Sequence, residues 1–239
     1  MKKAHIVAFC GQKGGTGKSG LAQAFAVEAA RQSGVVIIAD LDEGQRTSWE
    51  WGQVRIKNGL EPAVTVKSVS RLMVFQEAAL CDVLVIDAPG WADDLSVWMA
   101  HHSHLMVLPS KPTVQDMNPT IRLIHELRKK GVEDYRSAIV LNEVLQDSEA
   151  DFARKHLATQ GLFALAGHLR TMKSYRDVGR VGKTLTETPS PSLNKEVLGV
   201  LDGIGKALTA SEQQIANAKK TLVRLEVSGA GAKGRELGS

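Results

Sequence analysis

The stretch with the clearest chemical meaning is a glycine-rich loop with two lysines, GQKGGTGKS, residues 11–19. It follows the apolar run HIVAFC and precedes an apolar pattern with helical spacing, so a strand, a loop and a helix are expected in succession. That order is typical of loops that bind nucleotide phosphates, with the pattern G-x-x-x-x-G-K-[ST]. The match is incomplete, because Gln12 stands where the pattern has its first glycine.

Each residue type in this loop suits phosphate binding. Glycines let the backbone curl so that its N–H groups face phosphate oxygens, and the following helix adds its positive N-terminal end. Lys18 is expected to reach the β- and γ-phosphates, and the Ser19 hydroxyl is expected to hold Mg²⁺. The expected nucleotide-binding residues of the loop are Gly14, Gly15, Thr16, Gly17, Lys18, Ser19 and Gly20.

Acidic residues end two further apolar runs. DVLVIDAPG, residues 82–90, has the form of a Walker B strand, in which Asp87 would hold Mg²⁺ through water. VVIIADLDEGQ, residues 35–45, places Asp40 and Asp42 after another buried strand. A carboxylate there could orient the attacking water or support the metal, although capping of a following helix explains Asp42 almost as well.

The elements that must position these residues alternate along the chain. Helical patterns at 18–34 and 118–131 lie between short apolar runs. Continuous apolar strands separated by helices imply a parallel sheet covered on both faces, so we predict a doubly wound, mainly parallel α/β fold. The predicted strands are 4–10, 35–40, 63–67, 82–87, 104–109, 136–142 and 162–166.

The C-terminal part has a different pattern. After ETPSPS, a helical pattern runs from about Leu193 to Val227, and the Gly/Ala-rich end SGAGAKGRELGS is expected to be disordered. We therefore expect a nucleotide-binding domain over residues 1–208, a helical extension over 209–227 and a disordered tail over 228–239.

Composition limits the classes of protein to consider. The 239 residues are 43% hydrophobic and 23% charged, which is ordinary for one globular domain. Cys10 and Cys81 are too isolated for a disulfide framework or a metal cage, so we expect a reducing cytoplasm. We expect neither a targeting segment nor a membrane span. The net charge of +4 permits binding to nucleic acid or anionic lipid without establishing either.

Together these motifs resemble the ParA/MinD family of deviant Walker A ATPases, whose loop reads K-G-G-x-G-K-[ST] and matches residues 13–19 completely. The resemblance covers about residues 4–208 and is strongest toward short plasmid-partition ParA proteins. It implies a Mg²⁺-dependent ATPase that is weak alone and stimulated by a partner. It also implies that the early lysine, Lys13, reaches across a dimer to the partner's ATP, so that ATP holds the dimer together and hydrolysis releases it.

The same resemblance implies further roles. Asp40 would position the hydrolytic water, so the implied catalytic residues are Lys13, Lys18 and Asp40. LPSKPTVQD resembles the family's P-x-x-x-D segment near the adenine and the dimer face, which marks Pro112 and Asp116. Asn142 stands where relatives often place an adenine-binding side chain, although a simple turn residue after a strand is equally consistent. The family's D-x-D-P-Q sequence is not kept, because Glu43-Gly44-Gln45 follows Asp42.

Such ATPases often act as switches whose ATP-bound dimer binds non-specific DNA on the nucleoid. Basic residues within LRTMKSYRDVGRVGK could form that surface, because three of them recur at helical spacing and could neutralise several phosphates. A solvated surface is the alternative. The candidate DNA-binding residues are Arg170, Lys173, Arg176, Arg180 and Lys183. The implied partner is a ParB-like protein or a cargo adaptor, and the cargo a plasmid or a protein assembly such as a carboxysome.

Other functional classes fit the sequence less well. A MinD-like membrane switch would need a C-terminal amphipathic helix, but IANAKKTLVRLEV lacks bulky anchoring residues. Iron–sulfur relatives need cysteines that Cys10 and Cys81 do not supply, and tyrosine-kinase relatives need a terminal tyrosine cluster. The histidines of WMAHHSH are not expected to bind a metal, because no cysteine or carboxylate set completes a cage.

Overall fold

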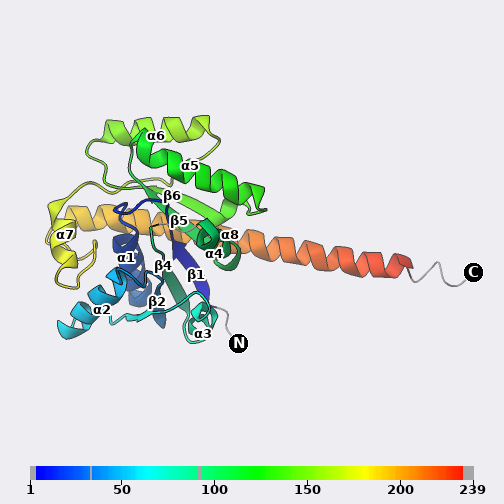
Figure 1. Cartoon of the computed structure of the whole chain (residues 1–239), viewed down its shortest axis with the longest axis horizontal. Coiled ribbons are helices and arrows are strands. Elements are labelled where there is room, and N and C mark those ends of the chain that lie inside the picture. The colour runs from blue at the N-terminus through cyan, green and yellow to red at the C-terminus, as the bar shows by residue number, and fades with distance from the viewer. Residues whose placement is uncertain (1–3, 33, 91–92, 234–239) are drawn as a thin grey trace, which may run out of the picture.

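The computed structural model describes residues 4–32, 34–90 and 93–233. Its six strands form one sheet with the order β3-β2-β4-β1-β5-β6, and every neighbouring pair is parallel (Figure 1). The strands are β1 (His5–Phe9), β2 (Val36–Asp40), β3 (Thr65–Ser68), β4 (Val83–Asp87), β5 (Leu105–Ser110) and β6 (Ser137–Leu141). The helices are α1 (Lys18–Arg31), α2 (Thr47–Lys57), α3 (Val74–Ala78), α4 (Asp93–His102), α5 (Val114–Lys129), α6 (Asp147–Thr159), α7 (Lys173–Gly179) and α8 (Pro191–Lys233).

Helices cover both faces of the sheet, so the predicted doubly wound α/β fold is confirmed. Alternate residues of a strand point to opposite faces, and Val7 and Phe9 of β1 therefore join one buried cluster while Ile6 and Ala8 join the other. The first cluster also takes residues of α1, α2 and α8. The second takes residues of α3, α4, α5 and α6. Both faces are apolar, which explains why the strands read as continuous apolar runs.

The topology places the candidate chemistry at one edge of the sheet. β1 lies between β4 and β5, where the connections change direction, and ligands of such sheets bind beyond the carboxyl ends of the strands at this point. Phe9 pairs with Asp87, and Asp87 with Asp40, so the ends of β1, β2 and β4 are in register. The glycine loop and both acidic strand ends therefore meet at the same edge.

The seventh predicted strand, 162–166, is wrong. The segment makes one isolated parallel bridge, between Ile139 and Ala164, and the Leu165 N–H donates to the Ile139 carbonyl at 2.8 Å. Glycines with positive φ stand on both sides, Gly161 at 66° and Gly167 at 79°. Because the chain turns at both glycines, the extended stretch between them is too short to form a regular ladder of hydrogen bonds with β6.

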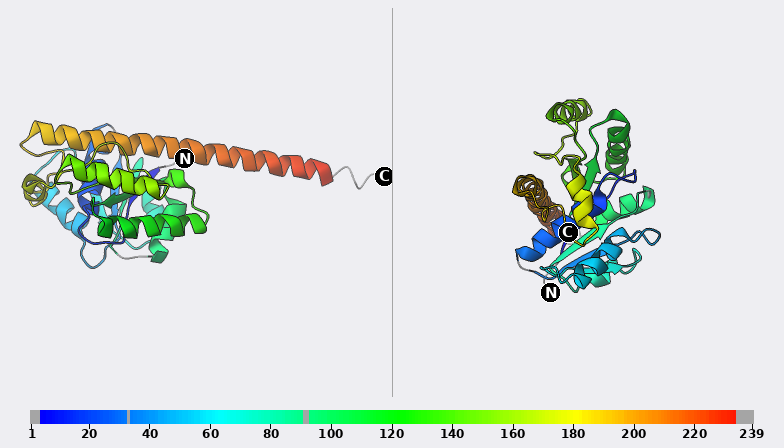
Figure 2. Two further views of the ribbon diagram at one scale, coloured as in Figure 1. Left: turned by 90° about the horizontal axis from the view of Figure 1, so that it is seen from above. Right: turned by 90° about the vertical axis from the view of Figure 1, so that its left-hand side faces the viewer.

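The last helix, α8, is longer than predicted. It runs without a break from Pro191 to Lys233, across the expected boundary at 208 and through the first six residues of the expected tail. A helix already formed adds residues at small cost, which explains its continuation. Figures 1 and 2 show α8 lying along the domain and then projecting beyond it. The expected disorder of 234–239 lies outside the described residues, and the division at 208 stays a prediction.

The projecting part of α8 also bears on the membrane alternative. None of the described helices combines the length and apolar character that crossing a bilayer requires. Leu222, Arg224 and Leu225 of the alternative's amphipathic pattern lie beyond the side chains that the structure describes.

Candidate functional site

A cavity of about 590 Å³ opens at the carboxyl edge of the sheet. It is lined by residues from three segments, 14–20, 42–47 and 87–90. These are the loops that follow β1, β2 and β4, and the first of them leads into the N-terminus of α1. The structure thus brings the glycine loop, the Walker B aspartate and the loop after Asp40 around one space. We call this space the phosphate cavity.

Two glycines of these loops lie so close to neighbouring groups that a side chain would force a shift. Gly17 precedes α1 with φ 84°, and a Cβ there would lie 2.1 Å from the Asn142 Nδ2 atom. A Cβ on Gly90 would lie 3.2 Å from the Gly14 nitrogen, so the loop after β4 packs on the glycine loop backbone to backbone. The glycine loop is therefore held in shape by its neighbours.

Lys18 begins α1 and is only 7% exposed. Its Nζ donates to the Lys13 carbonyl at 2.9 Å, across the bend of its own loop. Burial lowers the pKa of the Lys18 ammonium, against the opposing effect of the Asp87 carboxylate. A desolvated cation at a helix N-terminus, beside curled N–H groups, is suited to a phosphate.

Asp87 ends β4 with one carboxylate oxygen uncommitted. Its Oδ2 accepts from the Ser48 hydroxyl at 2.7 Å, whereas Oδ1 is buried and has no hydrogen-bond partner among the described residues. Burial raises the pKa of Asp87 to about 6, which the Ser48 and Ser19 hydroxyls oppose. A bare carboxylate oxygen facing a serine hydroxyl is the oxygen-only donor set that Mg²⁺ prefers. These residues fit the expected ion.

The expected Mg²⁺ would not be enclosed by the side chains of the described residues alone. Among the described residues, no group of three or more His, Cys, Asp or Glu side chains is placed to hold a metal. Of the histidines that are not expected to bind a metal, His104 accepts at Nδ1 from the Ile6 N–H, and His102 stacks on Trp98. A magnesium ion would take Ser19, Asp87 through water, and substrate phosphates, as Mg²⁺ commonly does.

The structure separates the two aspartates after β2. Asp40 is fully buried, its Oδ1 accepts from the Asp42 N–H at 3.0 Å, and its Oδ2 accepts from the Trp49 N–H at 2.9 Å. It therefore serves the first turn of α2 and does not line the cavity. Asp42 does line it, with Oδ1 accepting from the N–H groups of Gly44 and Gln45. The structure thus gives Asp40 a bond to the first turn of α2 and places Asp42 on the cavity wall, while the water-positioning role expected of Asp40 stays a prediction.

Lys13 is engaged within its own chain. Its Nζ donates to Asp116 Oδ1 at 2.9 Å, and the Thr113 hydroxyl donates to the other oxygen, Oδ2, at 2.6 Å. Burial alone would raise the pKa of Asp116, but these two hydrogen bonds and the charge of Lys13 lower it. Pro112 is buried just before α5, which Thr113 caps. The P-x-x-x-D segment therefore holds the second lysine of the loop.

A second, smaller pocket of about 270 Å³ adjoins the start of α1. Gly17 and Gly20 line both spaces, so the two are neighbours on one loop. Asn142 lines the small pocket and donates from Nδ2 to the Thr16 carbonyl at 2.7 Å. The small pocket thus adjoins the glycine loop at Asn142, whose binding of adenine stays a prediction. Its remaining lining residues are Glu143, Arg170, Thr171, Met172, Tyr175, Arg176 and Leu185.

All five candidate DNA-binding residues have exposed side chains, and their binding of DNA stays a prediction. Arg170 lines the small pocket and pairs with Asp147 at 3.6 Å and with Glu196 at 3.5 Å. The other four are exposed on α7 and the turn after it. We call residues 173–183 the basic segment, whose cations are Lys173, Arg176, Arg180 and Lys183. Arg176 also lines the small pocket, so this segment touches the nucleotide site.

The sequence interpretation missed several residues of the site. Ser48 was detectable in principle, as a hydroxyl in the first turn of the helix after an acidic loop. Met172, Tyr175 and Leu185 carry no such signal, because the fold alone brings them beside the glycine loop.

Comparisons with known proteins agree with this geometry. No protein-family model matches the sequence, and no curated protein matches it. Solved structures do match, among them a plasmid partition protein of Borrelia burgdorferi bound to AMPPNP, with TM-score 0.65, 12% identity and coverage of 85% of this chain and 99% of that one. The MinC:MinD cell division complex of Aquifex aeolicus matches with TM-score 0.65 and 11% identity, covering 85% of this chain and 96% of that one. The ATP complex of a McdA variant from Cyanothece matches with TM-score 0.63 and 17% identity, covering 86% of this chain and 98% of that one.

These identities are low, so the likeness concerns the fold. It extends over nearly the whole of each neighbour and over 85–86% of this chain. Together with the all-parallel sheet and the glycine loop at its switch point, it shows that the chain has the P-loop fold of the ParA/MinD ATPases.

Proposed function

We propose that this chain is an ATPase of the ParA/MinD type that binds Mg²⁺ and ATP in the phosphate cavity. The observation that carries the proposal is the orphaned Oδ1 of Asp87, buried beside Ser19 and the desolvated Lys18. A protein that kept this arrangement without a ligand would bear the cost of a buried, unsatisfied carboxylate oxygen. Bound Mg²⁺ would offset that cost and neutralise charge on the phosphates.

The chain's own residues supply the remaining chemistry. Lys18 donates to the β- and γ-phosphate oxygens once it leaves the Lys13 carbonyl. Asp42, on the cavity wall, orients the water that attacks the γ-phosphorus, the role that the resemblance gave to Asp40. Gly90, packed against Gly14, places the loop after β4 where it contacts the γ-phosphate. The products are ADP and phosphate.

The second lysine acts between two copies of the chain. Lys13 has 38% of its side chain exposed and is held by Asp116, so it can exchange this carboxylate for a phosphate of a partner's ATP. ATP then bridges two cationic loops, and hydrolysis removes the bridge. The expected assembly is an ATP-dependent homodimer.

The dimer binds non-specific DNA through the basic segment and is released when a ParB-like protein or a cargo adaptor stimulates hydrolysis. Four exposed cations within residues 173–183 support this step, because such clusters bind phosphates without reading sequence. The likeness to a partition protein and to McdA supports a nucleoid-associated, cytoplasmic protein that positions a cargo. The likeness to MinD keeps a membrane-surface switch as the second candidate.

The test is binding to random duplex DNA and to anionic liposomes with ATP, ADP or no nucleotide, for the wild type and Lys13→Ala. ATP-dependent DNA binding that the variant loses would support both the DNA switch and the role of Lys13 in the dimer. Liposome binding without DNA binding would favour the membrane switch. Binding to neither would contradict the role of the basic segment.

A further inference from the structure

Helix α2 and its C-cap residue, Asn58, donate hydrogen bonds to three consecutive backbone carbonyls of the turn after α7. Trp51 Nε1 donates to the Lys183 carbonyl at 3.0 Å, and Arg55 Nη1 donates to the Gly182 carbonyl at 3.0 Å. Asn58 Nδ2 donates to the Val181 carbonyl at 2.9 Å. The donors lie four and three positions apart, so they share one face of the helix. We call these three donors the α2 grip.

The backbones of the two segments touch within the grip. Gly182 has φ 78°, and a Cβ there would lie 2.5 Å from the Arg55 nitrogen and 2.6 Å from its Cα atom. Any side chain at this position would push the basic segment away from α2. If α2 moves, the turn that carries Lys183 must therefore move with it, because their backbones are in contact.

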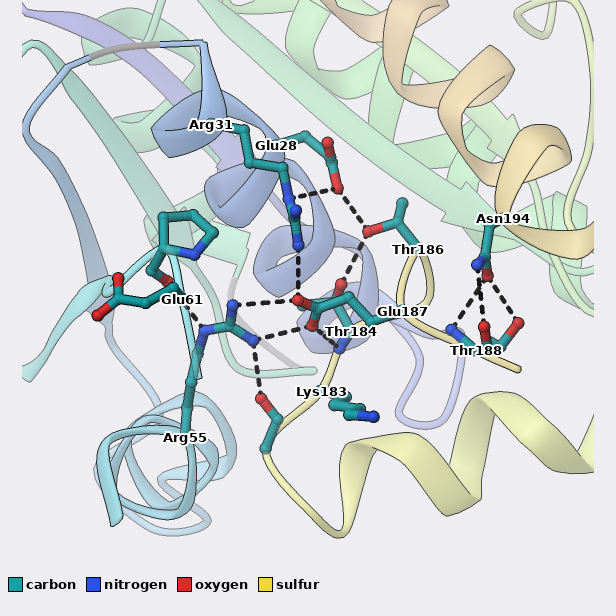
Figure 3. Close-up of polar contacts among 12 residues, drawn as sticks. Glu28, Arg31, Arg55, Glu61, Lys183, Thr184, Thr186, Glu187, Thr188 and Asn194 are labelled. Atoms are coloured by element: carbon teal, nitrogen blue, oxygen red, sulfur yellow. Dashed lines mark hydrogen bonds and ion pairs between the residues drawn. The ribbon is translucent and has the colours of Figure 1, made fainter. Parts of the chain in front are cut away.

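Arg55 is the centre of the contact (Figure 3). Its side chain is 1% exposed and forms a bidentate pair with Glu187, at 2.9 and 3.2 Å. Glu187 also accepts from Arg31 of α1 and from the Thr184 N–H. The planar guanidinium is matched to this fork of a carboxylate and a carbonyl. A buried pair of this kind defines one arrangement of the segments more than it adds stability.

The other end of α2 lies in the phosphate site. Thr47 lines the phosphate cavity, and the Ser48 hydroxyl donates to Asp87 Oδ2. The Trp49 N–H donates to the buried Asp40. The helix spans only 11 residues, about 16 Å. One short helix therefore contacts both the Walker B carboxylate and, through the α2 grip, the basic segment.

We infer that the α2 grip, centred on Arg55, is a positioning device that couples ligand binding at Asp87 to the placement of the basic segment. The inference rests on the proposed function in one respect, that a nucleotide binds in the phosphate cavity. When phosphates and Mg²⁺ engage Asp87, the Ser48 hydrogen bond changes and the first turn of α2 adjusts. The grip and the Gly182 contact pass this adjustment to the cations of 173–183, which bind a polyanion such as duplex DNA.

The test is hydrogen exchange of the peptides that cover 173–183, with and without Mg–AMPPNP. In the wild type, we expect nucleotide to slow exchange there. Asn58→Ala and Trp51→Phe each remove one grip hydrogen bond, and Arg55→Lys removes the bidentate pair while keeping the charge. Each should lose most of the nucleotide-dependent protection, with roughly two- to tenfold faster exchange for one lost hydrogen bond. Gln53→Ala, at an exposed position of the same helix, is the matched control.

Two further measurements keep the outcomes distinct. Nucleotide affinity and thermal unfolding are recorded for every variant, so that a folding defect or lost binding is recognised. If all variants bind nucleotide and keep the protection of the wild type, the inference is overturned. If the wild type binds no nucleotide, the proposed function fails, and Ser48→Ala then tests the inference alone. That variant removes the hydrogen bond between α2 and Asp87, so it should alter hydrogen exchange of residues 173–183 even without ligand. Unchanged exchange would overturn the coupling.

Discussion

The phosphate cavity and the basic segment are built in opposite ways. The cavity takes most of its glycines, with Lys18 and Ser19, from one run of neighbours, 14–20, whose backbone shape depends on these glycines and on the start of α1. The basic segment has exposed cations but is held by side chains far away in sequence, Arg55 being 127 positions from Gly182. Local backbone conformation therefore shapes much of the first region, with added contacts from Asn142 and Gly90, whereas tertiary contacts hold the second. Substitutions should accordingly damage ligand binding in the first and stability or placement in the second.

The sharpest contrast is between the two buried cations, Arg55 and Lys18. Arg55→Ala leaves Glu187 buried with only partial compensation, and we expect the free energy of unfolding to fall by about 3–5 kcal/mol. Lys18→Ala should remove nucleotide binding without a comparable loss, because the native state already disfavours that charge. Urea unfolding of both variants measures this. A fall in the free energy of unfolding of less than about 1 kcal/mol for Arg55→Ala would contradict the structural role given to Arg55.

Glu187 gives a pH-dependent form of the same test. Burial opposes its ionisation, but the hydrogen bonds from Arg55 and Thr184 lower the pKa of Glu187 below its ordinary value of 4.5. The ionised form is thus favoured by folding, and its contribution is full above pH 4.5 and is lost as the pH falls through the lowered pKa.

We therefore expect Glu187→Gln to cost about 1.5–3 kcal/mol at pH 7, the range for a hydrogen bond to a charged group. The difference from wild type should shrink below pH 4.5 in unfolding curves at successive pH values. A difference that grew on acidification would contradict the lowered pKa.

The cavity is expected to be sensitive at Gly17. Gly17→Ala puts a side chain at φ 84°, which costs about 1–2 kcal/mol, and displaces Asn142 from the Thr16 carbonyl. Nucleotide affinity should fall by roughly tenfold or more, the effect of 1.4 kcal/mol. Gly14→Ala is the matched control for stability, because a Cβ there meets nothing within 4 Å. Equal unfolding curves for the two variants would contradict the account of the loop.

The elements that follow from local pattern were predictable, and those that depend on distant contacts were not. The six apolar strands and the glycine loop carry their own signals, since burial on both faces and phosphate binding each need a distinct run of residues. The strand at 162–166 failed because Gly161 and Gly167 cut it short. Asp40 and Asp42 have the same sequence context, and only the packing of α2 over Asp40 shows which one faces the cavity.

The basic segment illustrates the same limit. The spacing of its cations is visible in the sequence, but the pocket that Arg176 and Arg170 line together is not. Arg55, Gly182 and Glu187 gave no signal, because a buried arginine and a left-handed glycine acquire meaning only when the fold joins them.

The smallest effect on stability is expected for the exposed cations. Lys173→Ala and Arg180→Ala should each change the free energy of unfolding by less than about 0.5 kcal/mol. If both contact DNA phosphates, each should lower the slope of log K against log salt by about 0.9. Fluorescence anisotropy over a salt series measures the slope, and Lys206→Ala, exposed on α8, serves as the control. If both variants keep the slope of the wild type, the basic segment does not contact DNA phosphates, and this prediction is wrong.

The central claim is that the phosphate cavity binds a nucleotide, and calorimetric titration with Mg–AMPPNP tests it most directly. The account predicts saturable binding of one nucleotide per chain to the wild type, and its loss in Lys18→Ala with the fold intact by circular dichroism. Absence of binding to the folded wild type, or equal binding to both proteins, would contradict it.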